Sequence, residues 1–115
     1  MEENGVEVRY HDKFVKWRDK LSDMRAEARI AKRIKQIEEK GHFGDQEFFG
    51  ESVWEMRIRY GPGYRLYYTR QGEKVIILLC GGDKSSQTED INLAKQLAKE
   101  AEIEWLGQIP KIRRR

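Results

Sequence analysis

The sequence predicts an α+β domain in which one sheet, built around three consecutive strands, is covered by helices from both ends of the chain. Polar and apolar residues alternate over residues 53–60, as in a strand with two unlike faces. Gly61-Pro62-Gly63 and Gln71-Gly72 then reverse the chain twice, because glycine allows a positive φ and proline fixes φ. Apolar residues recur at helical spacing before and after this region. We expect one antiparallel or mixed sheet of about four to five strands.

The N-terminal part predicts a short strand and two helices. Residues 6–10 alternate and indicate a strand at an edge of the sheet. Asp12 is the expected N-cap of a first helix, whose apolar face contains Phe14, Trp17 and Leu21. A second helix is expected from Met24 to Lys40, with Gly41 ending it and with a buried stripe of Ala26, Ile30, Ile34 and Ile37.

The C-terminal part predicts a buried strand and a third helix. Residues 74–80 are almost continuously apolar, so this strand should lie in the middle of the sheet. Ser86 and Glu89 have the spacing of a capping box at the start of a helix that reaches about Glu102. We therefore expect one domain over residues 1–102 and a frayed basic tail over residues 103–115.

Composition limits the classes of function. The 115 residues carry a net charge of +3, which suits a polyanionic partner. Cys80 is the single cysteine, so no intramolecular disulfide forms. His11 and His42 lack the spacing of metal ligands, and we expect them in turns or at the surface, with no metal or cofactor. No apolar run approaches the ~20 residues of a membrane span. We expect a soluble, cytoplasmic protein.

The arginines of the central strands suggest a binding site. Pairing across Gly61-Pro62-Gly63 would set Arg59 opposite Arg65 and Arg57 opposite Tyr67, all on one face. Like charges directly opposite each other are unfavourable, so this register predicts an anion between the arginines. The alternative is that the arginines lie over a solvated strand without a ligand.

Lys84 extends this predicted site. It comes directly before the third helix, where unpaired backbone N–H groups already favour an anion. Next to the arginine face, Lys84 would complete a cluster that holds an RNA phosphate and stabilises a pentacoordinate phosphorane. The second helix adds a basic face with Arg29 and Arg33, which would contact phosphates unless it is only solvated.

Several segments resemble a known family. The segments VWEMRIRYGPGYRLYYTR and ILLCGGDKSSQTEDI, preceded by FVKWRDKLSDMRAEARIAKRI and GHFGD, are similar to the bacterial addiction-module killer proteins, the HigB-like branch of the RelE/ParE toxin superfamily. The resemblance covers residues 6–101. It implies a RelE-like fold with two N-terminal helices on one face of the sheet, together with a C-terminal helix.

The resemblance also implies an activity. Such toxins belong to type II toxin-antitoxin modules, and RelE-like members cleave messenger RNA on the ribosome by attack of the 2′-OH on the adjacent phosphate. Carried over by motif, the residues at the scissile phosphate are Arg65 in GYR, Lys84 in GGDK and Arg57 in WEMRI. Further RNA contacts are expected from Arg59, Tyr67, Arg29 and Arg33. The implied partners are the ribosome, its mRNA and a cognate antitoxin, expected to be a helix-turn-helix protein.

The chain departs from the family pattern in two places. Glu-Leu-Arg reads Glu55-Met56-Arg57 here, and the last helix lacks the tyrosine or histidine that some members use as the general base. Lys84, Tyr67 and Glu55 are candidates for that role, in declining order. Two other functions stay open, a ParE-like inhibitor of DNA gyrase and an inactive homologue that binds RNA or an antitoxin.

Overall fold

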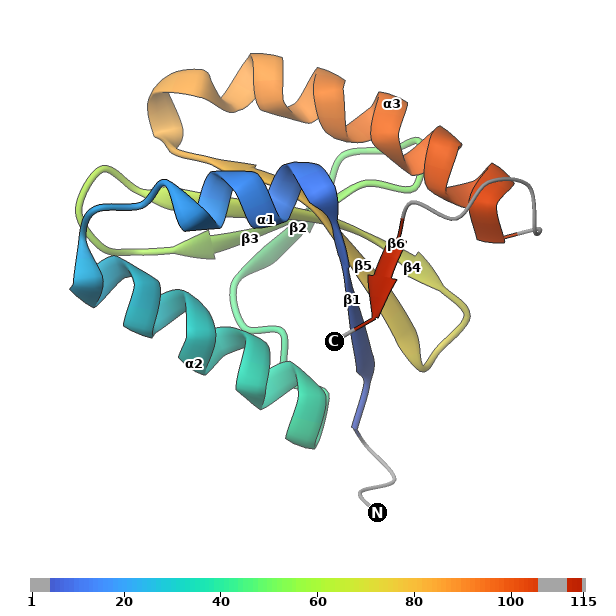
Figure 1. The fold of residues 1–115 in the computed structure, drawn as a ribbon, viewed down its shortest axis with the longest axis horizontal. Coiled ribbons are helices and arrows are strands. Elements are labelled where there is room, and N and C mark those ends of the chain that lie inside the picture. Colours follow the sequence, from blue (N-terminus) through green and yellow to red (C-terminus); the bar gives the residue numbers. More distant parts are fainter. Residues whose placement is uncertain (1–4, 106–111, 115) are drawn as a thin grey trace.

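The computed structural model describes residues 5–105 and 112–114. Figure 1 shows three helices and one twisted sheet. In chain order the elements are β1 (Glu7–His11), α1 (Asp12–Asp19), α2 (Met24–Lys40), β2 (Gln46–Phe48), β3 (Trp54–Ile58), β4 (Tyr64–Gln71), β5 (Val75–Gly82), the 3-10 turn η1 (Lys84–Ser86), α3 (Gln87–Trp105) and β6 (Ile112–Arg114). The predicted α+β class is confirmed. No helix of these described ranges is long and apolar enough to cross a membrane.

The sheet is mixed and has the strand order β2-β3-β4-β5-β1-β6. Strands β2 to β5 pair antiparallel, whereas β1 runs parallel to β5. The strand at 75–82 lies centrally, as its apolar sequence predicted. The sheet exceeds the expected four to five strands because Ile112–Arg114, expected in a frayed tail, pairs with β1. This pairing also places β1 inside the sheet, so the prediction of an edge strand is wrong.

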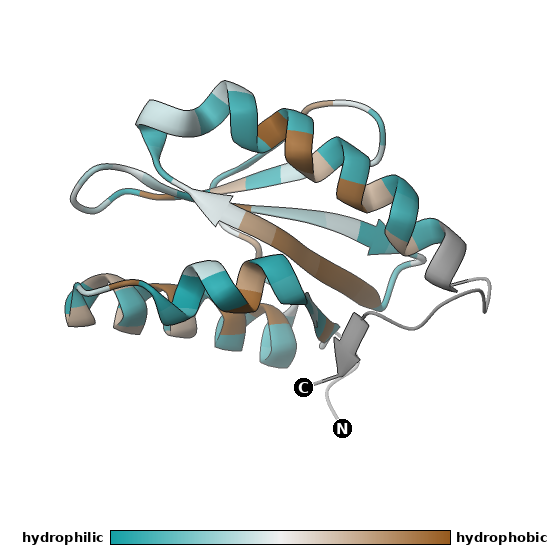
Figure 2. Cartoon of the chain, turned by 45° about the horizontal axis from the view of Figure 1, so that its top comes forward, coloured by the Kyte–Doolittle hydropathy of each residue, from teal (hydrophilic) through white to brown (hydrophobic). Residues whose placement is uncertain are grey.

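Helices cover both faces of the sheet (Figure 1). Alternation along β3 sends Met56 and Ile58 toward α1 and α2, where they join a core with Ile30 and Ile34. The other face packs against α3, with Tyr67 at its centre. Figure 2 shows a continuous apolar stretch through the middle of the sheet, between helices with polar outer faces. The two N-terminal helices therefore share one face, as expected, and α3 has the other face to itself.

Local signals explain most helix ends. Asp23 caps α2 by accepting hydrogen bonds from two backbone N–H groups, and Gly41 ends this helix with a φ of 68°. The four residues predicted for its apolar stripe are all buried. The first helix differs from the prediction: His11, not Asp12, is its N-cap, because His11 Nδ1 accepts the Lys13 N–H at 3.0 Å. His11 is thus buried rather than at the surface.

The start of α3 also differs from the predicted capping box. Asp83 caps η1 by accepting the backbone N–H of Ser85. The Ser86 hydroxyl bonds to the carboxylate of Asp90, one residue beyond the expected Glu89. The helix itself begins at Gln87 and buries its small and apolar residues Ala94, Leu97, Ala98 and Ala101 against the sheet.

Strand register corrects two predictions. Ile58 pairs with Tyr64, so residues 59–63 form the connection and Arg57, not Arg59, faces Arg65. Gly61 and Gly63 both have positive φ, which lets this wider turn form. Tyr67, predicted to lie opposite Arg57, instead faces Glu55 on β3 and Cys80 on β5, where a bulge follows it.

Candidate functional site

Glu55 is the centre of a polar cluster on the α3 side of the sheet. Its side chain is completely buried. Oε1 accepts hydrogen bonds from Arg65 Nη1 at 2.9 Å and from Arg57 Nε at 3.1 Å. Oε2 accepts one from Gln87 Nε2 at 2.9 Å. The cluster therefore connects β3, β4 and the first residue of α3, and its buried charge is compensated by two guanidinium groups.

The strand pattern explains this meeting. Glu55 and Arg57 are two residues apart on β3 and share a face, and Arg65 is directly opposite Arg57 on β4. The sequence predicted an anion between opposed arginines. In the structure that anion is the protein's own Glu55.

Carboxylates also surround Arg57 from the edge of the sheet. Asp45 Oδ1 accepts a hydrogen bond from Arg57 Nη1 at 3.1 Å, and Glu47 accepts one from Nη2. Arg59 is exposed and pairs with the other oxygen of Asp45 at 2.8 Å. The hydrogen bond from Arg59 is the largest cause of the lowered pKa of Asp45. Arg57 thus has three acidic partners, whereas Arg65 pairs with Glu55.

Lys84 lies beside the β3–β4 connection. The backbone N–H of Lys84 donates to the carbonyl oxygen of Pro62 at 3.5 Å. A Cβ added at Gly63 would lie 3.6 Å from the Cβ of Lys84. Arg65 faces Gly82, two residues earlier in the chain. The Lys84 side chain is exposed, and within residues 5–105 it forms no ion pair. The backbone thus brings Lys84 to the end of the sheet that carries Arg57 and Arg65.

Tyr67 lies in the core of the protein, under α3. It faces Glu55 across β3 and β4 and is completely buried, so its ring is not presented to an external RNA. Burial, and then the Glu55 charge, raise the pKa of Tyr67 far above its usual range. The phenol therefore stays protonated at neutral pH, which argues against Tyr67 as the general base. Glu55 is also a poor base, because both of its oxygens already accept hydrogen bonds from cations or an amide.

Arg29 and Arg33 lie on the other side of the sheet, on α2. The exposed Arg29 has its guanidinium 4.6 Å from the centre of the Tyr60 ring. Arg33 is half-buried and donates to the carbonyl oxygens of Phe43 at 2.8 Å and Arg57 at 2.5 Å. Arg33 therefore connects α2 to the sheet. The sequence had predicted that it would face phosphates or solvent. Both arginines line a cavity of about 240 Å³ together with Lys32, Gln36, Ile58 and Arg59.

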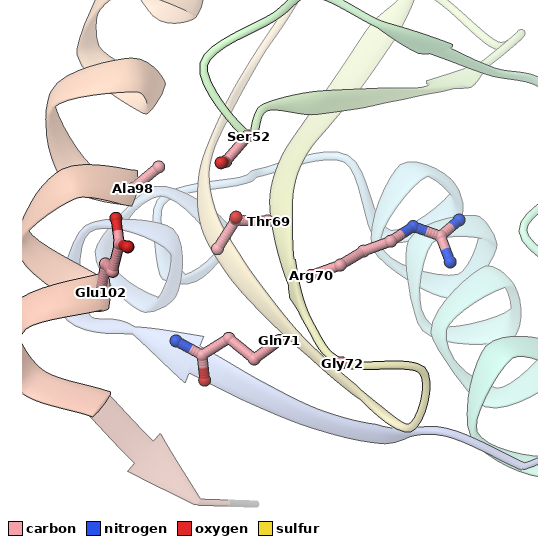
Figure 3. Close-up of a pocket in the computed structure, with 7 residues that line it drawn as sticks. All are labelled: Ser52, Thr69, Arg70, Gln71, Gly72, Ala98 and Glu102. Atoms are coloured by element: carbon pink, nitrogen blue, oxygen red, sulfur yellow. The ribbon is translucent and has the colours of Figure 1, made fainter. Parts of the chain in front are cut away.

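A larger cavity of about 400 Å³ lies between α3 and the strands (Figure 3). Ser52, Thr69 and Glu102 point into it, while Arg70 points to the opposite side of the sheet. Arg70 is the one cationic residue among the described residues of its lining and points away from the cavity, so the cavity does not suit a phosphate. Within the described residues, no group of three or more His, Cys, Asp or Glu is placed to hold a metal ion.

Sequence reasoning missed three residues of the cluster. Asp45, Glu47 and Gln87 belong to a turn, to β2 and to the start of α3, and each binds Glu55 or Arg57. The one available signal was the Glu55-Met56-Arg57 alternation, which sets opposite charges on one face of a strand. Gln87 gave no signal, because its contact requires α3 to fold back over β3.

The fold and the cluster define a small α+β protein whose exposed Lys84 lies at the same end of the sheet as an arginine–carboxylate network centred on the buried Glu55. Residues 16–99 match the model of the family described as phage-derived protein Gp49-like (DUF891), and the chain belongs to this family. An uncharacterized protein of Haemophilus influenzae (strain ATCC 51907 / DSM 11121 / KW20 / Rd) is 47% identical over 87 residues, which cover 76% of this chain and 87% of that protein. No solved structure matches. The match supports the toxin resemblance at the level of the Gp49-like family and does not specify the HigB-like branch.

Proposed function

We propose that this protein is the toxin of a type II toxin-antitoxin module and that it cleaves messenger RNA on the ribosome. Membership of the Gp49-like family is consistent with such a toxin. The observation that carries the proposal is Lys84, an exposed ammonium without an ion pair in the described structure, which lies in η1 two residues after Gly82, the strand partner of Arg65.

The proposed reaction needs electrostatic stabilisation above all. The 2′-oxygen attacks the adjacent phosphorus and forms the 2′-O–P bond as the P–O5′ bond breaks, giving a 2′,3′-cyclic phosphate and a 5′-OH end. The 2′-OH loses a proton and the leaving 5′-oxygen gains one. Lys84 would stabilise the extra charge of the phosphorane, with the partly exposed Arg65 beside it. Arg57 would contribute less, because three carboxylates already compensate its charge. The step itself calls for no metal.

Glu55 would act on this site through its partners. By holding Arg57 and Arg65 from one oxygen and Gln87 from the other, it fixes two guanidinium groups before RNA arrives. Such preorganisation avoids reordering long side chains in the transition state. Tyr67 is protonated, Glu55 is occupied and Lys84 acts as an ammonium, so none of the three serves as the general base and the proton of the 2′-OH would pass to solvent water.

The proposal includes partners and a location. A cognate antitoxin, expected to be a helix-turn-helix protein, would neutralise the toxin by covering the Lys84 rim, and the target would be the ribosome with its mRNA in the cytoplasm. The sequence supports a polyanionic target through the net charge of +3.

Mapping RNA 5′ ends in a translating extract tests the function. The wild type should produce cuts in phase with codons, and Lys84→Ala should reduce them by on the order of a hundredfold, the usual loss for one transition-state donor. Lys84→Arg should keep part of the activity. Lys35→Ala is the matched control, since Lys35 is also exposed but lies on the outer side of α2. Equal losses in Lys84→Ala and Lys35→Ala would show that bulk charge carries the effect. Intact message with inhibited DNA supercoiling would point to the gyrase inhibitor instead.

A further inference from the structure

A stack of aromatic rings reaches the surface at the β2 edge of the sheet, on the side of α2. The Phe48 and Trp54 ring centres are 4.8 Å apart, Trp54 and Tyr68 are 6.3 Å apart, and Tyr68 and Phe43 are 5.4 Å apart. Phe43 and Tyr68 are buried, whereas Phe48 is 52% exposed. Phe48 and Met24 are the large apolar side chains that the described structure leaves exposed. Phe48 is therefore the solvent end of this row of aromatic rings, tilted by 48° against Trp54.

Arg70 adds a cation to this stack. Its guanidinium carbon lies 4.4 Å from the centre of the Phe43 ring and 4.7 Å from that of Trp54. Figure 3 shows its side chain on the opposite side of the sheet from Thr69 and Glu102. Its Nη2 reaches Gln46 at 3.4 Å, and its buried Nε has no hydrogen-bond partner among the described residues. A planar cation over aromatic rings makes a surface on which a further planar group can stack.

The basic groove on α2 lies on the same side of the sheet. Arg29, Lys32 and Arg59 line it, and its floor is Ile58. Ile58 is four residues from Trp54 on the same face of β3, about 13 Å along the strand. Arg33 links the two features, since it lines the groove and donates to the carbonyl of Phe43, whose ring is in the stack.

We propose that this surface binds single-stranded RNA, with an unpaired base stacked on Phe48 and phosphates held by Arg29, Lys32 and Arg59. Base-stacking aromatic side chains next to a positively charged groove are the usual equipment of single-strand binding, because every base has a π face and every nucleotide a phosphate. Phe48, Arg29 and Lys32 lie across the sheet from Glu55, and Arg59 pairs with Asp45 at the edge between the two regions, so this surface is a second contact region. The proposal shares RNA as ligand with the proposed function, but it does not require cleavage.

Binding of two short oligomers tests the proposal without ribosomes. The probes are fluorescently labelled octaadenylate and an abasic ribose-phosphate octamer of the same length, measured by anisotropy with the Lys84→Ala protein. Phe48→Leu keeps an apolar side chain but removes the ring, and it should weaken octaadenylate binding at least about fivefold while leaving abasic binding unchanged. Phe48→Trp should restore octaadenylate binding. Arg29→Ala/Lys32→Ala should weaken both oligomers and lower the dependence of affinity on salt.

The outcomes separate this proposal from the proposed nuclease. If the Lys84→Ala protein bound octaadenylate equally well with and without Phe48→Leu, the stacking site would be overturned, whatever the cleavage assay shows. The stacking site would also be overturned if the Lys84→Ala protein that keeps Phe48 bound octaadenylate and the abasic octamer with equal affinity. Codon-phased cleavage that persists in Phe48→Leu, together with the predicted loss of octaadenylate affinity, would support both proposals. Loss of that affinity without cleavage by the wild type would support the stacking site alone.

Discussion

The carboxylate of Glu55 is completely buried and accepts a hydrogen bond from the Arg65 guanidinium at 2.9 Å. Glu55→Ala would leave two guanidinium groups without their shared buried partner, and we expect it to lower the free energy of unfolding by about 3 kcal/mol or more. Glu55→Gln should cost less, since the amide oxygen can still accept one hydrogen bond. Urea unfolding followed by circular dichroism measures both variants. Glu47→Gln is the control, because Glu47 is half exposed and also binds Arg57, and its cost should stay below about 1 kcal/mol. Similar costs at both positions would show that Glu55 is not the centre of the network.

Gly82 and Asp90 are in direct contact, so Gly82 cannot carry a side chain without movement. A Cβ at Gly82 would lie 1.8 Å from Asp90 Oδ2 and 2.9 Å from Ser86 Oγ. We expect Gly82→Ala to destabilise the protein by about 1–3 kcal/mol, as overpacking usually does. Adding Asp90→Ala should recover part of this loss, because it removes the clashing carboxylate. A double-mutant cycle from urea unfolding measures the coupling. Additive losses would contradict the contact.

Asp90 should make stability depend on pH. Burial is the main cause of its raised pKa, and the charges of Asp83 and Glu89 act in the same direction. A carboxyl group with a raised pKa in the folded state stabilises the fold when protonated, and this contribution is lost as the pH rises through the folded-state pKa. Asp90→Asn should therefore be more stable than the wild type at pH 7, and the gain should shrink toward pH 3. Thermal unfolding across this range measures it. A gain that does not change with pH would exclude ionisation of Asp90 as its cause.

The helices were predictable from sequence because their signals are local. Ile30, Ile34 and Ile37 recur every three to four residues between Asp23 and Gly41, and the N-cap and the C-terminal glycine need no distant contact. The structure reproduces these bounds. The first helix was less clear, since a histidine as N-cap has no comparable pattern.

Strand register and the charge balance of the site were not predictable in the same way. The sequence placed Arg59 opposite Arg65, but the connection after Ile58 takes five residues, and a turn of that length depends on contacts such as that between Tyr60 and Arg29. The role of Glu55 as the anion between two arginines depends on burial under α3. Lys84 was placed correctly before the last helix, because its position follows from the end of a buried strand and the start of an amphipathic segment.

Cys80 gives a direct test of how tightly α3 covers the sheet. Its thiol is buried and its Sγ lies 3.7 Å from the carbonyl of Asp90, and burial raises its pKa to about 12. The thiolate is the reactive form, so we expect the folded protein at pH 8 to react with a disulfide reagent more than about a thousandfold more slowly than the unfolded chain in guanidinium. Absorbance of the released thiol measures both rates. Gly82→Ala should speed the reaction of the folded protein, because displacing Asp90 loosens the start of α3. Fast reaction of the wild type would show that α3 opens readily under native conditions.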